Sequence, residues 1–526
     1  ITGYQDINKQ RITGTVTTIR SADIEGKGFT SIDDILIGTV SGLNATQSGR
    51  PGQDATIQIR GVNSLTGNTE PIWIVDGMPM QGEIPSIRSG ATDLQTTIFT
   101  TGIGNLAPDD IASITILKDA AATAIYGARA AKGDIVVTTK SGTVGKTRFN
   151  ASLNYGVTAA PVNNISMMNS AQKIQFERDI YNDLNTNRTG RISELLRLRD
   201  LGIISTADVE QQITSLSQTN TDWFKEIFSP ANSTQIGFSM SGGSEKTQHY
   251  LSVNHLQEEG IQPNNKFDRT GMNIKLTHDL NDKIRITGGL ASTLKNDRSS
   301  ASAINPLNYA MFANPYEKLY NADGSYAYDQ SYDMTLSTLR PGLAWPKFNI
   351  LDDLNRNTNT SRYIDADVSL KLEYEIIPGL QFITHGTYNV NSNNSRVTEG
   401  EQTYTNFIRN WFTYNGETAP QYVRGSLNEG TAYSDGYTFR NTLQYSKSFQ
   451  EKHFLTLFGG QEITSRTTYN SFNYSPIYDA DHRIIGFPEM GGVNPEAIKY
   501  NNLGGTGKVI NKLSSFFANA SYSYAD

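Results

Sequence analysis

The stretch Ala366-Asp367-Val368-Ser369-Leu370-Lys371-Leu372-Glu373-Tyr374-Glu375-Ile376 alternates strictly between apolar or aromatic residues and polar or charged ones. Successive side chains of a β-strand point to opposite faces of a sheet, so this period of two predicts a strand with one apolar and one polar face. The same period recurs in four other segments, at residues 149–157, 236–240, 284–294 and 516–524. The alternation by itself fits either a soluble sheet with one buried face or a membrane-spanning barrel.

The lengths of the connections between these segments distinguish the two alternatives. Short links at residues 242–246, 281–283, 377–379 and 449–452 alternate with longer links near 163–232, 257–267, 296–360, 393–430 and 467–510. Outer-membrane barrels have short periplasmic turns and long extracellular loops, whereas a soluble sandwich has no reason to alternate so regularly. We therefore expect residues 146–526 to form about ten strands of an antiparallel transmembrane β-barrel. An open sheet of that size would leave two unpaired edges in lipid, so we expect the rest of the barrel to lie outside this sequence.

The composition is compatible with such a barrel. The chain of 526 residues contains 26 Tyr, 21 Phe and 46 Gly, as aromatic girdles and tight turns require. No stretch approaches the roughly 18–20 consecutive apolar residues of a spanning helix, which excludes a helical membrane protein. The net charge is -7, whereas nucleic-acid-binding proteins usually have basic patches. Because the sequence contains no Cys, disulfides and catalytic thiolates are excluded.

Residues 1–145 have a different, mixed pattern that predicts a compact α+β domain. Ser31, followed by Asp34 and an apolar run, predicts a capped helix with Gly42 near its end. Short strands are expected at residues 56–60, 72–75, 113–117 and 135–139, and a helical turn at 119–126. No signal peptide is visible, and the first residues are typical of the middle of a protein, so we expect a further N-terminal part.

Several stretches of this domain occur in an order and spacing typical of one family. They are Gly38-Thr39-Val40-Ser41-Gly42-Leu43, Gly49-Arg50-Pro51-Gly52, Ile57-Gln58-Ile59-Arg60-Gly61, residues 71–79 and, most diagnostic, residues 116–131 with Gly133 and Thr138-Thr139-Lys140. Weaker matches follow at residues 222–224, 241–244 and 259–261. Together these segments resemble the SusC/RagA family of TonB-dependent outer-membrane transporters. One departure is Lys132-Gly133-Asp134, where the family more often has Asn-Gly and then an apolar residue.

The resemblance implies a plug domain, residues 1–145, inside a barrel of about twenty-two strands, of which roughly the first ten are present. It implies TonB-dependent import of oligosaccharides or oligopeptides across the bacterial outer membrane, with long loops extracellular and a SusD-like surface lipoprotein as a lid. Pairs of transporter and lid could form dimers. TonB would pull a short box whose tail is Ile1, Thr2 and Gly3. The resemblance implies no cofactor.

Nine plug residues are candidates for the family signature or for coupling to TonB: Arg60, Gly61, Asp76, Gly77, Lys118, Asp119, Tyr126, Gly127 and Arg129. Arg60 and Arg129 could each donate several hydrogen bonds to carboxylates or carbonyls. Such pairs either fix the plug or break when TonB pulls. Asp76-Gly77 is predicted to be a tight turn, with Gly supplying a positive φ.

Candidate cargo contacts fall into two groups. Gln81, Arg88 and Gln95 lie in a plug segment without strong periodicity, and the resemblance places such segments near the cargo. Trp345, Trp411 and Tyr414, with Phe348 and Tyr404, lie in long predicted loops, where aromatic faces suit sugar rings and peptide side chains. The alternative roles are solvated loops, interfacial girdles or loop cores. Helical segments near residues 171–184 and 193–201 could pack on the lid.

No catalytic constellation is evident, so an enzyme is not expected. The six histidines do not have the spacing of a metalloprotease motif, so no metal site is predicted. The segment Gly504-Gly505-Thr506-Gly507-Lys508 lacks the upstream Gly of a phosphate-binding loop. Two alternatives to nutrient import stay open. One is a siderophore or vitamin receptor of the same general architecture, and the other is an outer-membrane binding protein that transports nothing.

Overall fold

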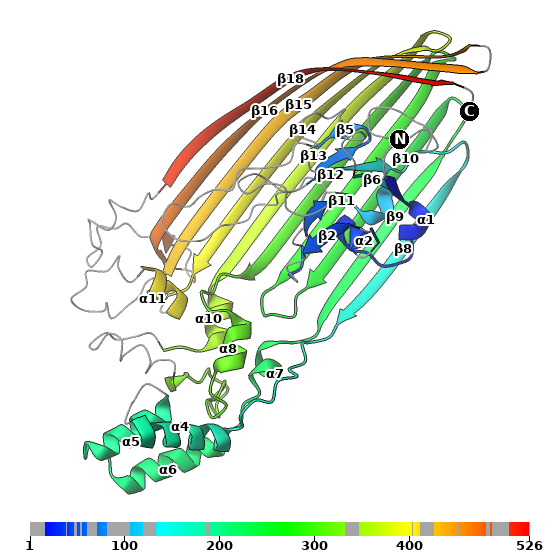
Figure 1. The fold of residues 1–526 in the computed structure, drawn as a ribbon. Coiled ribbons are helices and arrows are strands. Elements are labelled where there is room, and N and C mark those ends of the chain that lie inside the picture. The colour runs from blue at the N-terminus through cyan, green and yellow to red at the C-terminus, as the bar shows by residue number, and fades with distance from the viewer. Residues whose placement is uncertain are drawn as a thin grey trace.

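A computed structural model provides the structure of the chain. It describes residues 16–524 except 38, 41, 47–49, 53–54, 60–70, 81–105, 119–132, 185–189, 332–346, 402, 411–424, 450–451, 480–483 and 486–503. Figure 1 shows three parts: a long curved sheet, a small α+β domain on its concave side, and a group of helices at one end of the strands.

The large sheet is antiparallel and has 11 strands, which confirms the predicted fold class. The strands are β8 (Gly145–Thr158), β9 (Ala231–Gly243), β10 (Thr247–Glu259), β11 (Lys266–Asn281), β12 (Ile284–Ser300), β13 (Thr358–Ile377), β14 (Leu380–Glu399), β15 (Gly425–Phe449), β16 (His453–Asp479), the short β17 (Ile484–Ile485) and β18 (Gly504–Tyr524). Each strand from β8 to β16 pairs with the next, and β16 also pairs with β17 and β18.

The connections alternate in length as predicted. All four tight turns join the expected strand pairs and lie at one end of the sheet, and the longer connections lie at the other end (Figure 1). The strands, however, extend further into the predicted long loops than expected. β15 has 25 residues and β16 has 27, whereas a barrel strand needs only about 9–11 to cross a bilayer. In this added length the apolar residues do not keep to one face. In β16, Phe472 and Tyr474 share the inward parity of Arg466 and Thr468, whereas Tyr469 faces outward, so the regular alternation that marks a strand in the sequence is lost there.

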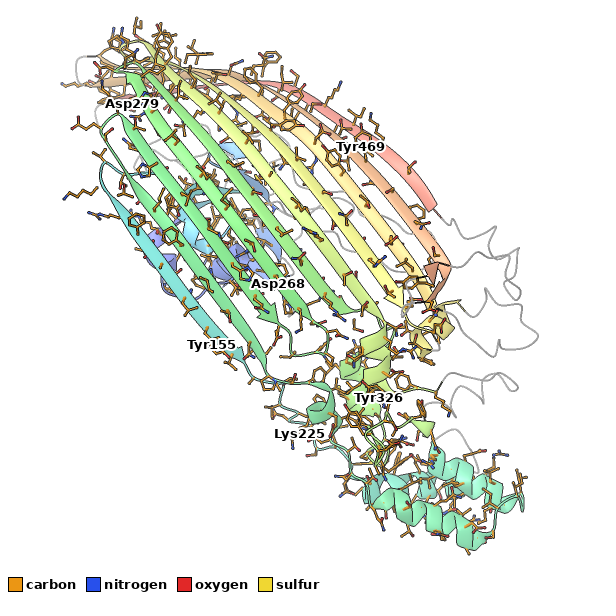
Figure 2. The ribbon with its side chains drawn as sticks, turned by 180° about the vertical axis from the view of Figure 1, so that it is seen from behind. Tyr155, Lys225, Asp268, Asp279, Tyr326 and Tyr469 are labelled. Atoms are coloured by element: carbon orange, nitrogen blue, oxygen red, sulfur yellow. The ribbon has the colours of Figure 1, made fainter. Side chains whose placement is uncertain are left out.

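The two faces of the sheet differ in what covers them. In β15 the outward-facing Tyr437 and Phe439 are 48% and 45% exposed, while the inward-facing Thr438 and Arg440 between them are 4% and 5% exposed. Figure 2 views the convex face, with the α+β domain behind the sheet, and Tyr155 and Tyr469 are labelled on it. The apolar set of the alternation therefore faces outward and the polar set faces the α+β domain.

The α+β domain contains a five-stranded sheet with the order β1-β6-β7-β4-β5. Its strands are β1 (Val16–Arg20), β4 (Ile72–Val75), β5 (Met78–Pro79), β6 (Ile111–Leu117) and β7 (Asp134–Thr139), and a separate hairpin consists of β2 (Leu43–Thr46) and β3 (Thr56–Ile59). The predicted strands are thus confirmed. Two apolar clusters join the described elements. The larger includes Leu36, Ile114, Ile116, Ile135 and Val137, and the smaller consists of Ile74, Leu117 and Val136.

Two short helices, α1 (Ser21–Ile24) and α2 (Ile32–Leu36), and the 3₁₀ helix η3 (Pro108–Asp110) complete the domain. Ser31 caps α2 as predicted, because its hydroxyl accepts from Asp34 N while the Asp34 carboxylate accepts from Ser31 N. The helix ends at Leu36, earlier than the sequence suggested. The Thr39 hydroxyl donates to the carbonyls of Ile35 and Leu36, which takes the place of further helical bonds.

The helices at the far end belong to the long connections. The predicted helical segments in the first connection are confirmed as α4 (Ser170–Leu184) and α5 (Arg191–Asp200), which pack with α6 (Thr206–Ser217) around a small apolar core. A second core joins α7 (Trp223–Ile227), α8 (Pro306–Phe312), α10 (Ile350–Arg356) and α11 (Tyr404–Asn410). No helix in the described part of the chain is long and apolar enough to cross a membrane.

Asp134 in β7, the residue that departs from the family pattern, makes the stability of the α+β domain depend on pH. Its side chain is 0% exposed, and neither carboxylate oxygen has a hydrogen-bond partner in the described residues. Burial raises the pKa of Asp134 to about 8. An unfolded Asp titrates near pH 4, so between about pH 4 and pH 8 the unfolded state releases this proton while the folded state keeps it. Stability is therefore lost as the pH rises through this window.

We predict that Asp134→Val raises the unfolding temperature of the protein in detergent, and more at pH 8 than at pH 5. The wild type should lose up to about 5 kcal/mol across the window, since one pKa unit corresponds to about 1.4 kcal/mol. Asp183→Val, at an exposed position of α4, serves as the control. If the unfolding temperatures of the wild type and the Asp134 variant depend equally on pH, then the pKa of this carboxyl is the same in the folded and unfolded states.

Candidate functional site

The turn between β4 and β5 contacts the concave face of the sheet. Both of its central residues, Asp76 and Gly77, have positive φ, at 48° and 86°. Such angles are typical of the two-residue turns that match the twist of a hairpin, and Asp and Gly are the residues that adopt them most readily. The predicted tight turn at Asp76-Gly77 is confirmed.

The Asp76 carboxylate joins the α+β domain to β11. It accepts hydrogen bonds from Thr139 N at 2.9 Å and Thr139 Oγ1 at 2.6 Å, at the end of β7. Lys275 Nζ of β11 donates to Asp76 Oδ2 at 2.9 Å and to Thr139 Oγ1 at 3.0 Å. One lysine thus binds two elements of the domain at the same point.

The carbonyl of Gly77 is bound from the other side of the concave face. Arg440 Nη1 of β15 donates to Gly77 O at 2.6 Å, and Arg440 Nη2 and Nε donate to Glu462 Oε2 of β16 at 2.7 and 3.0 Å. The side chains of Arg440 and Glu462 are only 6% and 1% exposed. The carboxylate therefore fixes the guanidinium in the position from which it binds the turn. We call Asp76, Gly77, Lys275, Arg440 and Glu462 the hairpin latch.

A second group of polar contacts lies nearer the first strands. Asp110, at the end of η3, is 3% exposed and accepts from Tyr250 Oη of β10 at 2.9 Å, and burial raises the pKa of this carboxyl. The neighbouring Asp109 accepts from Ser152 Oγ of β8 at 3.1 Å. Arg269 Nη2 of β11 donates to the carbonyl of Thr30 at 2.9 Å. In the described residues the domain is therefore attached to the sheet by several separate polar contacts, and the Phe267 ring of β11 also packs against Gly52.

A cavity of about 150 Å³ lies beside the latch, between the β4–β5 hairpin and the concave face. Its lining from the sheet includes the polar side chains of Tyr363, Asp365, Asp367, His385, Asn389 and Arg466. Asn389 Nδ2 donates to Asp365 Oδ2 at 3.2 Å and to Asp367 Oδ1 at 2.9 Å. No cluster of metal-ligating side chains occurs among the residues that the structure describes.

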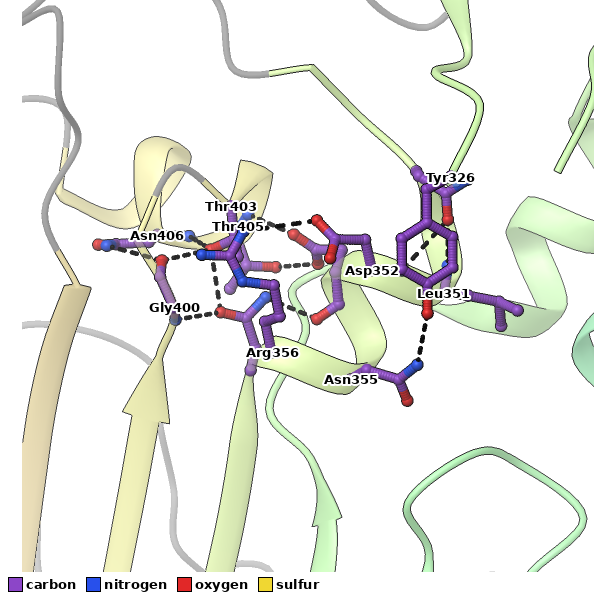
Figure 3. A network of polar contacts seen from close by, with 12 residues as sticks. Tyr326, Leu351, Asp352, Asn355, Arg356, Gly400, Thr403, Thr405 and Asn406 are labelled. Atoms are coloured by element: carbon purple, nitrogen blue, oxygen red, sulfur yellow. Dashed lines mark hydrogen bonds and ion pairs between the residues drawn. The ribbon is translucent and has the colours of Figure 1, made fainter. Parts of the chain in front are cut away.

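The long connections are held together above the strands by a buried polar network (Figure 3). Asn357 Oδ1 accepts from Gly400 N and Thr403 Oγ1, both at 3.0 Å, which ties the start of β13 to the end of β14. The Asp353 carboxylate of α10 accepts from Thr405 N at 3.0 Å and Thr405 Oγ1 at 2.6 Å. Asp353, Asn357 and Thr405 are all at most 2% exposed. The network gives α10 and α11 a fixed position at the rim.

Phe348 and Tyr404, which the sequence offered as candidate cargo contacts or as loop core, form loop core. They are 1% and 6% exposed, and their rings meet edge to face with centroids 5.4 Å apart. Tyr309 packs against Phe348 in the same way at 5.5 Å. These aromatic side chains stabilise the rim.

Of the other predicted site residues, Asp76 and Gly77 belong to the hairpin latch, and Lys118 is half-buried just after β6. The rest lie outside the described residues: Ile1, Thr2, Gly3, Arg60, Gly61, Gln81, Arg88, Gln95, Asp119, Tyr126, Gly127, Arg129, Trp345, Trp411 and Tyr414. Sequence reasoning missed Lys275, Arg440 and Glu462. Charged residues are ordinary at inward-facing positions of such strands, so nothing in the sequence set these three apart.

Comparisons with known proteins agree with this architecture. Residues 8–133 match the family model of the TonB-dependent receptor plug domain. TonB-dependent receptor P26 of Formosa agariphila is 26% identical over 542 aligned residues, covering 100% of this chain and 46% of the relative. TonB-dependent receptor SusC of Bacteroides thetaiotaomicron is 23% identical over 485 residues, covering 88% of this chain and 42% of the relative. The chain thus spans less than half the length of these curated relatives.

Solved structures share the fold. The RagAB peptide importer in its closed-closed state matches with a TM-score of 0.75 at 21% identity, over 98% of this chain and 54% of the other. The unliganded ferric citrate transporter FecA matches with a TM-score of 0.54 at 9% identity, over 97% of this chain and 54% of the other.

A plug domain on the concave face of a long-stranded antiparallel sheet defines the TonB-dependent receptors of bacterial outer membranes. The chain is similar over its whole length to TonB-dependent receptors, and SusC is among the relatives that it matches. The α+β domain is therefore the plug, and the large sheet is barrel wall.

We predict that Arg440→Met destabilises the receptor by roughly 3–5 kcal/mol, because it leaves the buried Glu462 carboxylate without this partner. The unfolding temperature in detergent is the measurement. The double variant Arg440→Met/Glu462→Gln should be more stable than the single variant, since no uncompensated charge stays buried. If the effects of Arg440→Met and Glu462→Gln simply add, the two side chains do not act as a pair.

Proposed function

We propose that the chain belongs to a TonB-dependent importer that carries nutrient oligomers, either oligosaccharides or oligopeptides, across the outer membrane. The hairpin latch is the observation that supports this proposal most directly. It holds the plug against strands on both sides of the concave face through single charged or polar contacts. An importer needs a plug that closes the lumen at rest and can be displaced when force is applied.

The two kinds of contact around the plug suit that requirement. The interior of the plug is an apolar core, which loses free energy steeply when it is opened to water. The latch consists of groups that water can solvate once they separate, so each contact contributes only about 1–3 kcal/mol. A pull through TonB would therefore release the plug from the wall before it unfolds the plug core. Ile1, Thr2 and Gly3 stay predicted as the tail of the TonB box, and Arg60 and Arg129 as coupling residues.

The helices at the long-connection end support a partner at the mouth of the barrel. α4, α5 and α6 project from the sheet at this end (Figure 1). Just before α4, the side chains of Val162, Ile165, Met167 and Met168 are 44–79% exposed. A run of exposed apolar side chains is typical of a contact surface. A SusD-like lipoprotein lid is the partner proposed for it, with this end of the barrel extracellular, and two such pairs could form a dimer.

The cargo proposal rests on the family and on the polar inner face. RagAB, which has the higher TM-score of the two solved structures compared above, is named as a peptide importer. The name of the SusC relative states no cargo. Asp365, Asp367 and Arg466 of the inner face present both signs of charge to a passing oligomer. Gln81, Arg88, Gln95, Trp345, Trp411 and Tyr414 stay predicted cargo contacts.

Uptake by cells that carry the receptor tests the proposal. Cells with and without functional TonB are offered labelled oligosaccharide, oligopeptide and ferric siderophore pools. TonB-dependent uptake of one of the first two pools supports nutrient import and names the cargo class. Uptake of the siderophore pool alone, or binding without uptake of any pool, would replace the proposal by one of its alternatives.

We predict that Asp76→Asn/Lys275→Met loosens the plug, because it removes the charged contact between the hairpin and β11. Cells with this variant should become several-fold more sensitive to a large polar antibiotic in the absence of TonB. The matched control is Asp279→Asn/Arg285→Met, which removes an exposed ion pair from the same region of β11 and β12. Equal sensitivity of the two variants would show that the latch does not hold the plug closed.

A further inference from the structure

The outward face of β13 marks one boundary of the lipid-facing band. From Ile376 back to Ile364, every outward position holds an apolar or aromatic residue, and Ile364, Val368 and Leu370 are 42–60% exposed. At about 3.3 Å per residue and a tilt of about 45°, this run spans about 28 Å along the membrane normal, close to the roughly 25 Å band of outer-membrane barrels. The next outward residues are Arg362 and Thr360. The band therefore ends between Ile364 and Arg362.

Three arginines surround Thr360 just beyond this boundary. Arg298 of β12 and Arg396 of β14 are the register partners of Thr360 on its two sides, and Arg362 is the next outward residue on the same strand. Residues in direct register have Cβ atoms about 4.5–5.5 Å apart, and outward neighbours along a strand are about 7 Å apart. All three guanidinium groups can thus reach the space in front of the Thr360 hydroxyl.

These residues line a groove of about 630 Å³ on the outward face. Its charged lining on this face consists of Lys266, Arg298, Arg362 and Arg396 against Asp268 and Glu429, with Asp268 labelled on the convex face in Figure 2. Arg396 pairs with Glu429 at 2.8 Å and Lys266 with Glu259 at 3.0 Å. The side chains of Arg298 and Arg362 make no ion pair or hydrogen bond with any described residue. Two adjacent guanidinium groups that make no ion pair of their own favour an anionic ligand, although Asp268 lies in the same lining.

We infer that this groove binds the phosphate of a bilayer lipid headgroup at the long-connection side of the membrane. Guanidinium groups recognise phosphate through paired hydrogen bonds, and a Thr hydroxyl can donate one more. The position favours a lipid over a soluble anion, because Ile364 and its register partner Leu294 continue the groove directly into the apolar band. Acyl chains can lie on that surface while the phosphate binds the arginines. Nearby, Tyr433 and Tyr469 pack at 6.3 Å, as in an interfacial aromatic girdle.

Native mass spectrometry of the receptor released from detergent tests the inference, with phosphatidic acid, diacylglycerol and inorganic phosphate as probes. We expect the wild type to retain phosphatidic acid at concentrations where diacylglycerol is not retained. Arg298→Gln/Arg362→Gln should weaken this binding at least tenfold. The control Arg197→Gln/Arg199→Gln removes the same charge from α5, far from the groove, and should bind like the wild type.

A second variant separates loss of binding from loss of folding. Thr360→Glu places a carboxylate among the three arginines, so it should abolish phosphatidic acid binding without lowering the unfolding temperature. Unchanged binding in Arg298→Gln/Arg362→Gln, or an equal loss in the α5 control, would overturn the inference. Displacement of phosphatidic acid by an equal concentration of inorganic phosphate would overturn the lipid assignment and make the groove a site for soluble phosphate.

Discussion

Strands that cross a lipid bilayer must pair their backbone N–H and C=O groups with neighbouring strands, and the rest of this structure depends on that constraint. From β8 to β16 each strand pairs with the next in an antiparallel ladder that contains only a few register shifts. A continuous ladder fixes which side chains face outward. It therefore also fixes where each inward charge meets the plug.

The plug combines a stable interior with separable contacts to the wall. Its described elements pack around apolar clusters of their own, whereas Lys275, Arg440 and Tyr250 contact it through single polar groups. Because Arg440 is held by Glu462 of the neighbouring strand, the wall presents a preorganised donor to the Gly77 carbonyl. A domain attached in this way can separate from its wall without losing its own fold.

The same alternation that points Lys275 and Arg440 inward points Arg298, Arg362 and Arg396 outward. Inside, the charges have partners in the plug or on a neighbouring strand. Outside, beyond the lipid-facing band, two of the arginines make no ion pair or hydrogen bond with any described residue, and they line a groove on the outward face. One backbone pattern thus produces two sets of charges, one that contacts the plug and one at the edge of the lipid-facing band.

Local patterns in the sequence determined the strands of the barrel wall, the tight turns, the Ser31 cap and the Asp76-Gly77 turn, because each depends on residues close together in the chain. The full length of β15 and β16 escaped prediction, since the apolar residues of β16 do not keep to one face over its added length. Tertiary structure alone decided that Asp76 meets Lys275, that Gly77 meets Arg440 363 residues away, and that Thr360 lies between two arginines. Those contacts depend on strand register and plug position, which come from pairing across the whole sheet and leave no local signal.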